Sequence, residues 1–245
     1  MSASYDTDVT TFSPAGRLFQ VEYACQAVNQ GSPVVGLRSN NLVVLAAIRR
    51  RATELESYAE KVFKIDEHLG VGIAGLNADG RVLHRHMRNE CLNHRYVYEA
   101  PLNVGRLASH LGHKAQKATQ SASKRPYGVG MLLAGADKTG PKLFEFSPSG
   151  SVNEFLAMAI GGRAQSAKTY LERHFEQFSA CSEAELVSHA LSALTRCLEQ
   201  DGKLTKDNVS VAVVGTEKAF TEYSAEQLQA VLDGIQAAVP VPMEI

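Results

Sequence analysis

The residues of this 245-residue chain that could carry out chemistry do not form the common catalytic patterns. The sequence contains no GxSxG nucleophile elbow, no HExxH zinc helix and no GxxxxGK[ST] phosphate loop. The segment Gly70–Gly75, which reads GVGIAG, matches the GxGxxG fingerprint of dinucleotide-binding proteins. In that fingerprint the glycines form the turn after a strand, whereas here Val71 and Ile73 alternate within the predicted strand. We therefore interpret it as a glycine-bearing strand, with dinucleotide binding as the minor alternative.

Histidines and cysteines are the remaining candidate ligands and nucleophiles. His84 and His86 are two residues apart on a predicted helix, whereas His110 and His113 are three apart and can share a face. Two imidazoles do not complete a zinc site, so surface histidines are the preferred interpretation over metal ligands. The cysteines have neither CxxC spacing nor the density of a disulfide scaffold, and we expect small buried hydrophobes. They are Cys25, Cys91, Cys181 and Cys197.

The composition excludes several classes of protein. Hydrophobic residues make up 44% and charged residues 21%, which argues against a disordered or fibrous chain. Lys and Arg number 25 and Asp and Glu 26, so the net charge of −1 gives no general attraction to nucleic acid or to an anionic membrane. The longest apolar run, Leu42–Ile48, is far shorter than the roughly 20 residues of a membrane span. The first twenty residues lack the pattern of a secretory signal, so we expect the protein to act inside the cell.

Hydrophobic periodicity divides the chain into blocks of strands and pairs of helices. A helix is predicted over 17–29, with Gly31 as its C-terminal glycine. Strands are predicted over 34–37, 42–48, 62–66, 71–74, 131–134, 143–146, 156–160 and 209–213. Helices are predicted over 77–96, 101–118, 167–178 and 182–198, and from 224 onward. This order favours an α+β fold, a four-layer αββα sandwich of two antiparallel sheets flanked by helix pairs.

Three local signals should fix the ends of these helices. Asn77 and Asp79 are suited to satisfying the free amides at the start of the 77–96 helix. Pro101 suits the first turn of the next helix. Ser182 with Glu185 predicts a capping box at the start of the 182–198 helix.

The segment Tyr5–Ala24, YDTDVTTFSPAGRLFQVEYA, resembles the N-terminal signature of proteasome alpha subunits. Matches continue along the chain at 60–62, 74–76, 125–129 and 208–211, and cover about residues 5 to 235. The resemblance implies a single alpha-type domain over 1–245 with the N-terminal nucleophile hydrolase-like fold, and a gate tail and ring-contact helix within 1–31. Within the family, segments 89–92, 125–130 and 166–174 are most similar to the eukaryotic alpha type-1 branch, sixth in the alpha ring.

The resemblance also implies a function and partners. It predicts a non-catalytic structural and gating subunit of the 20S alpha ring that supports ubiquitin-dependent and ubiquitin-independent protein degradation. The partners would be two neighbouring alpha subunits, beta-ring subunits below, and a regulatory particle or activator above. No cofactor, metal, nucleic acid or membrane is implied. The expected location is the cytoplasm and nucleus.

The alternative is a catalytic chain of the same fold, either a beta-type threonine protease subunit or a self-processing amidohydrolase. Beta chains are cleaved so that a threonine becomes the N-terminus of the first strand, and its amine acts as the base. An Asp follows Leu-Ala-Ala in those chains, and a Lys lies nearby. Here the strand opens with Gly31-Ser32-Pro33, and Ile48 follows Leu-Ala-Ala. Catalysis by this chain is therefore disfavoured.

Two groups of site residues carry over from the resemblance. Tyr5, Asp6, Pro14 and Tyr23 match the cluster that holds the N-terminal tails in an open-gate arrangement, and the alternative is an ordinary lead-in to a helix. Thr7 stands where an arginine usually follows Tyr-Asp, which removes any ion pair made by that arginine.

Lys61, with Gly31 and Leu76, matches the intersubunit pocket that accepts the C-terminal tail of proteasome activators. An ammonium at the mouth of an apolar groove suits a terminal carboxylate. The alternative for Lys61 is a solvated lysine at the start of a strand.

Overall fold

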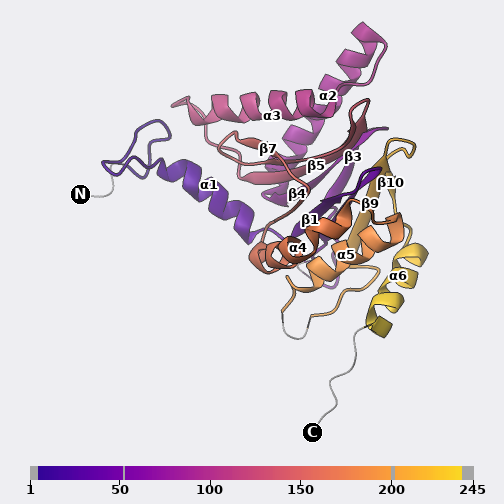
Figure 1. Ribbon diagram of the computed structural model, residues 1–245. Helices are drawn as coiled ribbons and strands as arrows, with labels where there is room; N and C mark the ends of the chain where they lie inside the picture. Colours follow the sequence, from indigo (N-terminus) through magenta and orange to yellow (C-terminus); the bar gives the residue numbers. More distant parts are fainter. Residues whose placement is uncertain (1–4, 52, 200–201, 239–245) are drawn as a thin grey trace.

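Two five-stranded antiparallel sheets are stacked face to face in the computed structural model, and helices cover both outer faces (Figure 1). The structure describes residues 5–51, 53–199 and 202–238. The predicted four-layer αββα sandwich is confirmed.

The first sheet has the strand order β10-β9-β2-β1-β8. Its strands are β1 (Val34–Arg38), β2 (Leu42–Ile48), β8 (Ala157–Ile160), β9 (Val209–Gly215) and β10 (Thr221–Glu222). The two central pairs are fully in register, as Val34 lies opposite Ala47 and Leu45 opposite Ala212. The outer face is covered by α4 (Ala164–Phe178) and α5 (Glu183–Thr195), and α6 (Ala225–Ala238) packs beside α5.

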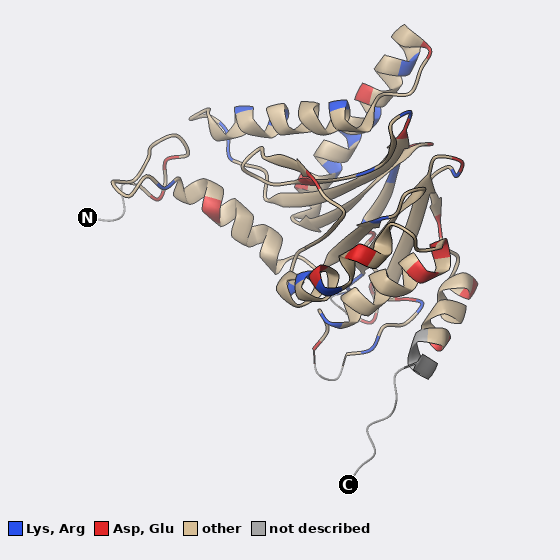
Figure 2. Cartoon of the chain, viewed as in Figure 1, with Lys and Arg blue, Asp and Glu red and all other residues tan. Residues whose placement is uncertain are grey.

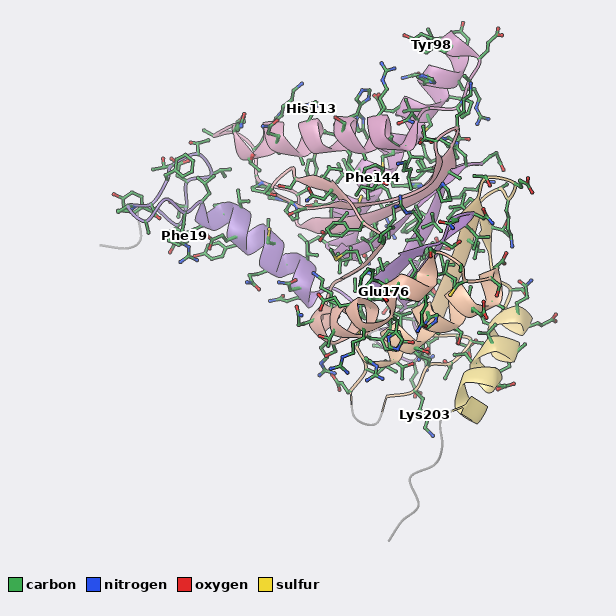
Figure 3. All side chains as sticks on the ribbon, viewed as in Figure 1. Phe19, Tyr98, His113, Phe144, Glu176 and Lys203 are labelled. Atoms are coloured by element: carbon green, nitrogen blue, oxygen red, sulfur yellow. The ribbon has the colours of Figure 1, made fainter. Side chains whose placement is uncertain are left out.

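The second sheet has the order β3-β4-β5-β6-β7. Its strands are β3 (Val62–Asp66), β4 (Leu69–Gly75), β5 (Val129–Asp137), β6 (Gly140–Phe146) and β7 (Val152–Glu154). The helices α2 (Asn77–Tyr98) and α3 (Val104–Thr119) cover its outer face, and Figure 3 shows Phe144 between α3 and the sheet. The remaining helix, α1 (Phe19–Gln30), packs against one end of β4 and β5.

Three apolar layers hold these parts together. One lies beneath α4 and α5, one beneath α2 and α3, and the third lies between the two sheets. Each large side chain buried in them stabilises the fold by about 1.5–3 kcal/mol. Charged residues are concentrated on the outer helices and loops in Figure 2, which agrees with this division. The segment Gly70–Gly75 forms part of β4, so it is a glycine-bearing strand as interpreted.

Several local predictions were wrong for physical reasons. Gly31 is the C-cap of α1 as predicted, but glycine is needed there for a reason the sequence does not show, since its φ is −68° and a Cβ would lie 2.1 Å from the Gly75 amide nitrogen. Pro101 precedes α3, whose N-cap is Asn103, which accepts a hydrogen bond from the Arg106 amide at 3.1 Å. The cap of α2 is Leu76, which has no polar side chain, and Asp79 is bonded elsewhere.

Other local predictions are confirmed. The Ser182–Glu185 capping box is present at the start of α5. The bounds of β2 and β3 match those predicted from the sequence. The buried face of α4 consists of Ala167, Leu171 and Phe178, and Phe175 of the same helix is 47% exposed.

The four cysteines are buried to different extents, and the histidines are not grouped for metal binding in the part of the chain that the structure describes. Cys91 and Cys197 are buried, and burial raises their thiol pKa to about 12 and about 11. Cys25 and Cys181 are only half-buried, so the prediction of buried hydrophobes fails for those two. Within the described ranges no group of three or more His, Cys, Asp or Glu side chains is placed to hold a metal ion. Over the same ranges no helix is long and apolar enough to cross a membrane.

Candidate functional site

A hydrogen bond joins the two ends of the N-terminal segment. The Tyr23 hydroxyl donates to Asp6 Oδ1 at 2.7 Å, and the Gln20 side-chain amide donates to the Asp6 carbonyl. Because the Asp6 carboxylate accepts this proton, the pKa of the Tyr23 phenol lies above its ordinary value. Tyr5 is half-buried at the start of the described chain, next to Asp6. The first turn of α1 is thus tied to the chain fourteen to seventeen residues earlier.

A tight turn over residues 13–17 leads into α1. The Ser13 carbonyl accepts from the Gly16 amide at 2.8 Å, and Ser13 Oγ accepts from the Arg17 amide at 3.1 Å. Pro14 lies exposed within this turn, where its fixed φ is suitable and its missing amide hydrogen is not needed. Gly16 adopts a left-handed φ of 74°. The predicted cluster is therefore spread along the segment: Asp6 and Tyr23 meet, and Pro14 shapes the turn between them.

The C-terminal end of α1 reaches a corner where three backbone segments come together. A Cβ on Gly31 would lie 2.1 Å from the Gly75 amide nitrogen, and a Cβ on Gly75 would lie 2.4 Å from the Gly128 carbonyl oxygen. Gly75 has a φ of 108°, a conformation that side chains rarely adopt. Only glycines permit these approaches, so the corner is set by backbone packing.

Lys61 lies opposite Ile73, two residues before Gly75 at the end of β4. Its carbonyl accepts from the Ile73 amide at 2.9 Å, and its side chain is buried, with 4% of the residue exposed. Burial, with the charge of Arg50 adding to it, lowers the pKa of the Lys61 ammonium to about 8. Among the described residues no carboxylate offsets these two effects. Lys61 is therefore not the solvated lysine of the alternative interpretation, and it lies below the surface instead of at a groove mouth.

Leu76 follows Gly75 directly and is 49% exposed. Its amide donates to the Gly128 carbonyl at 2.9 Å, and a Cβ on Gly128 would lie 2.7 Å from Leu76 Cδ1. Gly31, Lys61 and Leu76 are thus on three segments that adjoin the end of β4. The structure brings the three residues of the second predicted site into one region.

One ion pair beside Leu76 was missed from the sequence. Arg125 donates to both carboxylate oxygens of Asp79, at 2.6 and 2.8 Å, and Asp79 also accepts from the Gly128 amide at 2.9 Å. These hydrogen bonds lower the pKa of the Asp79 carboxyl below its ordinary value, and those from Arg125 have the largest effect. Asp79 appeared suited to capping because capping is a local signal, whereas Arg125 lies 46 residues away in the sequence.

The position that a catalytic nucleophile would occupy is at the same corner. Ser32 is buried, with 6% of the residue exposed, and its nitrogen is an ordinary peptide amide following Gly31. The Pro33 carbonyl accepts from the Ile48 amide at 3.1 Å, so the first strand does lie beside the position of the catalytic Asp. That position is filled by the apolar side chain of Ile48, 6% exposed. Ser32 therefore has no free amine to act as a base, and Ile48 provides no carboxyl group beside it.

Two family models match the chain. The model described as "Proteasome subunit" matches residues 28–214. The model for the N-terminal signature of A-type proteasome subunits matches residues 5–27.

Curated relatives are similar over nearly the whole chain. The proteasome alpha type-1 protein of Trypanosoma brucei rhodesiense is 49% identical over 233 residues, which are 95% of this chain and 88% of the relative. The alpha type-1 subunit of Dictyostelium discoideum is 44% identical, over 98% of this chain and 97% of its own length. The alpha type-6 subunit of Saccharomyces cerevisiae is 49% identical, over 91% of this chain and 96% of its own length.

Proposed function

The chain belongs to the proteasome alpha-subunit family, and from this premise we propose that it builds and gates the alpha ring of the 20S core particle without itself hydrolysing peptide bonds. It is a structural subunit of that ring. The observation that carries the finer proposal is the alpha-type N-terminal segment, which continues without a break into α1, and α1 packs against β4 and β5 at the corner where a beta chain would carry its nucleophile. Gating and activator binding follow from the residues on that segment and at that corner.

The lack of catalysis rests on Ser32 and Ile48. An N-terminal amine at Ser32 would require cleavage directly after α1, whose Val28 is buried between the sheets. We expect core particles containing this chain to carry adducts of threonine-directed covalent inhibitors on beta subunits only, measured by intact-mass spectrometry of each subunit. An adduct on this chain, or loss of its residues up to Gly31, would make it a processed hydrolase.

We assign Lys61 the role of binding the terminal carboxylate of an activator tail. Burial disfavours the charged form of the Lys61 ammonium. A carboxylate bound beside it would stabilise that form and raise the lowered pKa of Lys61. In particles with Lys61→Ala, the concentration of tail peptide that gives half-maximal stimulation should rise about five- to hundredfold. Lys61→Arg keeps the charge and should restore part of the affinity. Equal titrations of wild type and Lys61→Ala would remove Lys61 from this role.

The same assignment predicts a pH dependence. Above pH 8 the Lys61 side chain without a bound tail becomes neutral, so tail affinity should fall as the pH rises through about 8, and binding should take up protons there. Particles with Lys61→Arg should lose this dependence because an arginine stays charged. The measurement is the same titration at several pH values between about 7 and 9.5, with the basal hydrolysis rate as the reference.

The remaining proposals concern neighbours and location. Two alpha subunits on either side, beta subunits below and a regulatory particle or activator above are the partners that this ring position requires. Cytoplasm and nucleus are the proposed location. Native mass spectrometry of the endogenous particle, with cross-linking to identify adjacent chains, tests both the ring position and the neighbours.

A further inference from the structure

We propose that the Asp79–Arg125 ion pair is a positioning device that fixes Leu76 and thereby tunes the affinity of the proposed activator-tail pocket. The proposal rests on the tail-binding role given above to Lys61, Gly31 and Leu76. It adds two residues that lie outside that set and that act through it.

The ion pair joins two segments that are distant in the sequence. Asp79 is in the first turn of α2 and is 7% exposed as a residue, while Arg125 lies within the loop 120–128 that leads from α3 to β5. The paired guanidinium nitrogens fit the carboxylate in the bidentate arrangement that fixes orientation as well as distance. Arg125 also donates to its neighbour's carbonyl on Pro126 at 3.0 Å, which holds the loop in one conformation.

The same carboxylate fixes the backbone that touches Leu76. Asp79 Oδ2 accepts from the Gly128 amide, and the Gly128 carbonyl in turn accepts from the Leu76 amide. The Leu76 side chain lies over Gly128, since a Cβ there would meet Leu76 Cδ1 at 2.7 Å. A loop that moved by a few tenths of an ångström would therefore move Leu76, and Gly75 would be pressed toward Gly31.

The contacts of Arg125 fit a residue that holds the Asp79–Arg125 ion pair in place (the clamp) better than one that binds a ligand directly. The Arg125 side chain is 63% exposed, but its donors toward the protein are held by Asp79 and Pro126. Asp79 is almost buried, so removing Arg125 leaves a carboxylate with a single amide donor at the corner. Tail affinity should therefore fall when the two-nitrogen contact of Arg125 is lost, even if the positive charge is kept.

The chain provides a matched control at the other end of α2. Arg95 donates to both oxygens of Asp66 at 2.7 and 2.9 Å, with exposures similar to those of the Asp79 pair. This second ion pair contacts neither Gly128 nor Leu76. Arg95→Gln therefore removes an ion pair of similar exposure, in which one guanidinium nitrogen reaches both oxygens, without touching the corner.

The experiment uses core particles carrying Arg125→Gln, Arg125→Lys or Arg95→Gln, with a synthetic peptide of an activator C-terminal tail as the probe. For Arg125→Gln we expect the half-stimulating peptide concentration to rise about three- to tenfold while maximal stimulation stays unchanged. Arg125→Lys should fall between Arg125→Gln and wild type. Hydrogen exchange in peptides spanning 74–79 and 125–130 should accelerate in Arg125→Gln and stay at the wild-type rate in Arg95→Gln.

A second variant keeps the proposal testable if Arg125→Gln does not fold. Gly128→Ala keeps the ion pair but pushes on Leu76 directly, and it should also raise the half-stimulating concentration. Unchanged tail affinity in both Arg125→Gln and Gly128→Ala, in particles where Lys61→Ala weakens the tail, overturns the clamp and leaves the pocket standing. If Lys61→Ala has no effect, the pocket assignment fails, and wild-type exchange at 74–79 in Arg125→Gln would then overturn the positioning role by itself.

Discussion

The N-terminal segment before α1 and the glycine corner after it are held in opposite ways. The segment depends on hydrogen bonds between exposed side chains, such as the one from Tyr23 to Asp6, where Tyr23 is 49% exposed. The corner depends on backbone atoms in contact at Gly31, Gly75 and Gly128, and the buried Lys61 is bonded to Ile73 of the same strand, β4. Interactions of the first kind are individually weak and screened by water, whereas the second kind cannot be broken without moving the core. The gating role proposed for the segment requires interactions of the first kind, and the tail binding proposed for the corner requires the second.

The sharpest test of this contrast compares two glycines with positive φ. Gly75→Ala adds a Cβ 2.4 Å from the Gly128 carbonyl oxygen at a φ of 108°, and we expect a loss of about 3–5 kcal/mol in unfolding free energy. Gly16→Ala, at a φ of 74° with open space around it, should cost only about 1 kcal/mol. Urea denaturation of the two variants measures both values. Equal losses would mean that the corner is no tighter than the turn.

Replacing the buried Lys61 should increase the stability of the folded chain even though it removes the proposed binding of the activator tail. At pH 7 the wild-type chain buries a charged ammonium whose pKa is about 8 in the folded state and near 10.5 when unfolded. The folded state therefore binds fewer protons between these values, and wild-type stability rises as the pH climbs from 8 to 10.5. Lys61→Met should raise the unfolding free energy by about 1–3 kcal/mol at pH 7, and this advantage should shrink toward pH 10.5.

The control for that measurement is Lys64→Met, because Lys64 carries an exposed ion pair with Glu67 near the same strand. It should leave stability nearly unchanged at both pH values. A destabilised Lys61→Met chain would contradict an unpaired buried charge at this position.

A smaller effect is expected in the N-terminal segment. Tyr23→Phe keeps the ring stacked on Phe19 but removes the hydrogen bond to Asp6. Hydrogen exchange over residues 5–18 should become about two- to fivefold faster, with the exchange of β4 unchanged. Basal peptide hydrolysis by the particle reports whether the gate population shifts with it. Faster exchange in β4 would contradict the independence of the two regions.

The smallest effect should come from Arg17. Its ion pair with Glu22 joins two exposed side chains, and such pairs contribute little in water. Arg17→Gln should change the exchange of residues 5–18 by less than about twofold, and the change should vanish at high salt. A larger shift would mean that this ion pair, and not Tyr23 with Asp6, holds the segment.

The sequence predicts this molecule best where the signal is local. The apolar run of β2 and the capping box of α5 identify those elements because the residues that define them are adjacent in the chain. The strand β7 was missed because Val152–Glu154 is short and mostly polar. Asp79 resembles a cap in the sequence because its true partner, Arg125, is far along the chain. Gly31 was identified as necessary, but the reason is the backbone of Gly75, which only the fold brings close.

The same limit applies to the candidate site. The family signature located Asp6, Tyr23, Lys61, Gly31 and Leu76, and the fold groups the last three near one end of β4. The burial of Lys61 and the clamp beside Leu76 depend on contacts between sheets, helices and loops. No periodicity in the sequence carries that information.

The edges of both sheets have a consequence for the subunit before it joins a ring. β7 has three residues and β10 has two, so each sheet ends on one side in a strand too short to template another chain. In a subunit that is free of its ring, a long open edge would invite pairing with other chains and amyloid-like stacking. The strands β7 and β10 close that route at their own edges, whereas the opposite edges are formed by β8 with four residues and β3 with five.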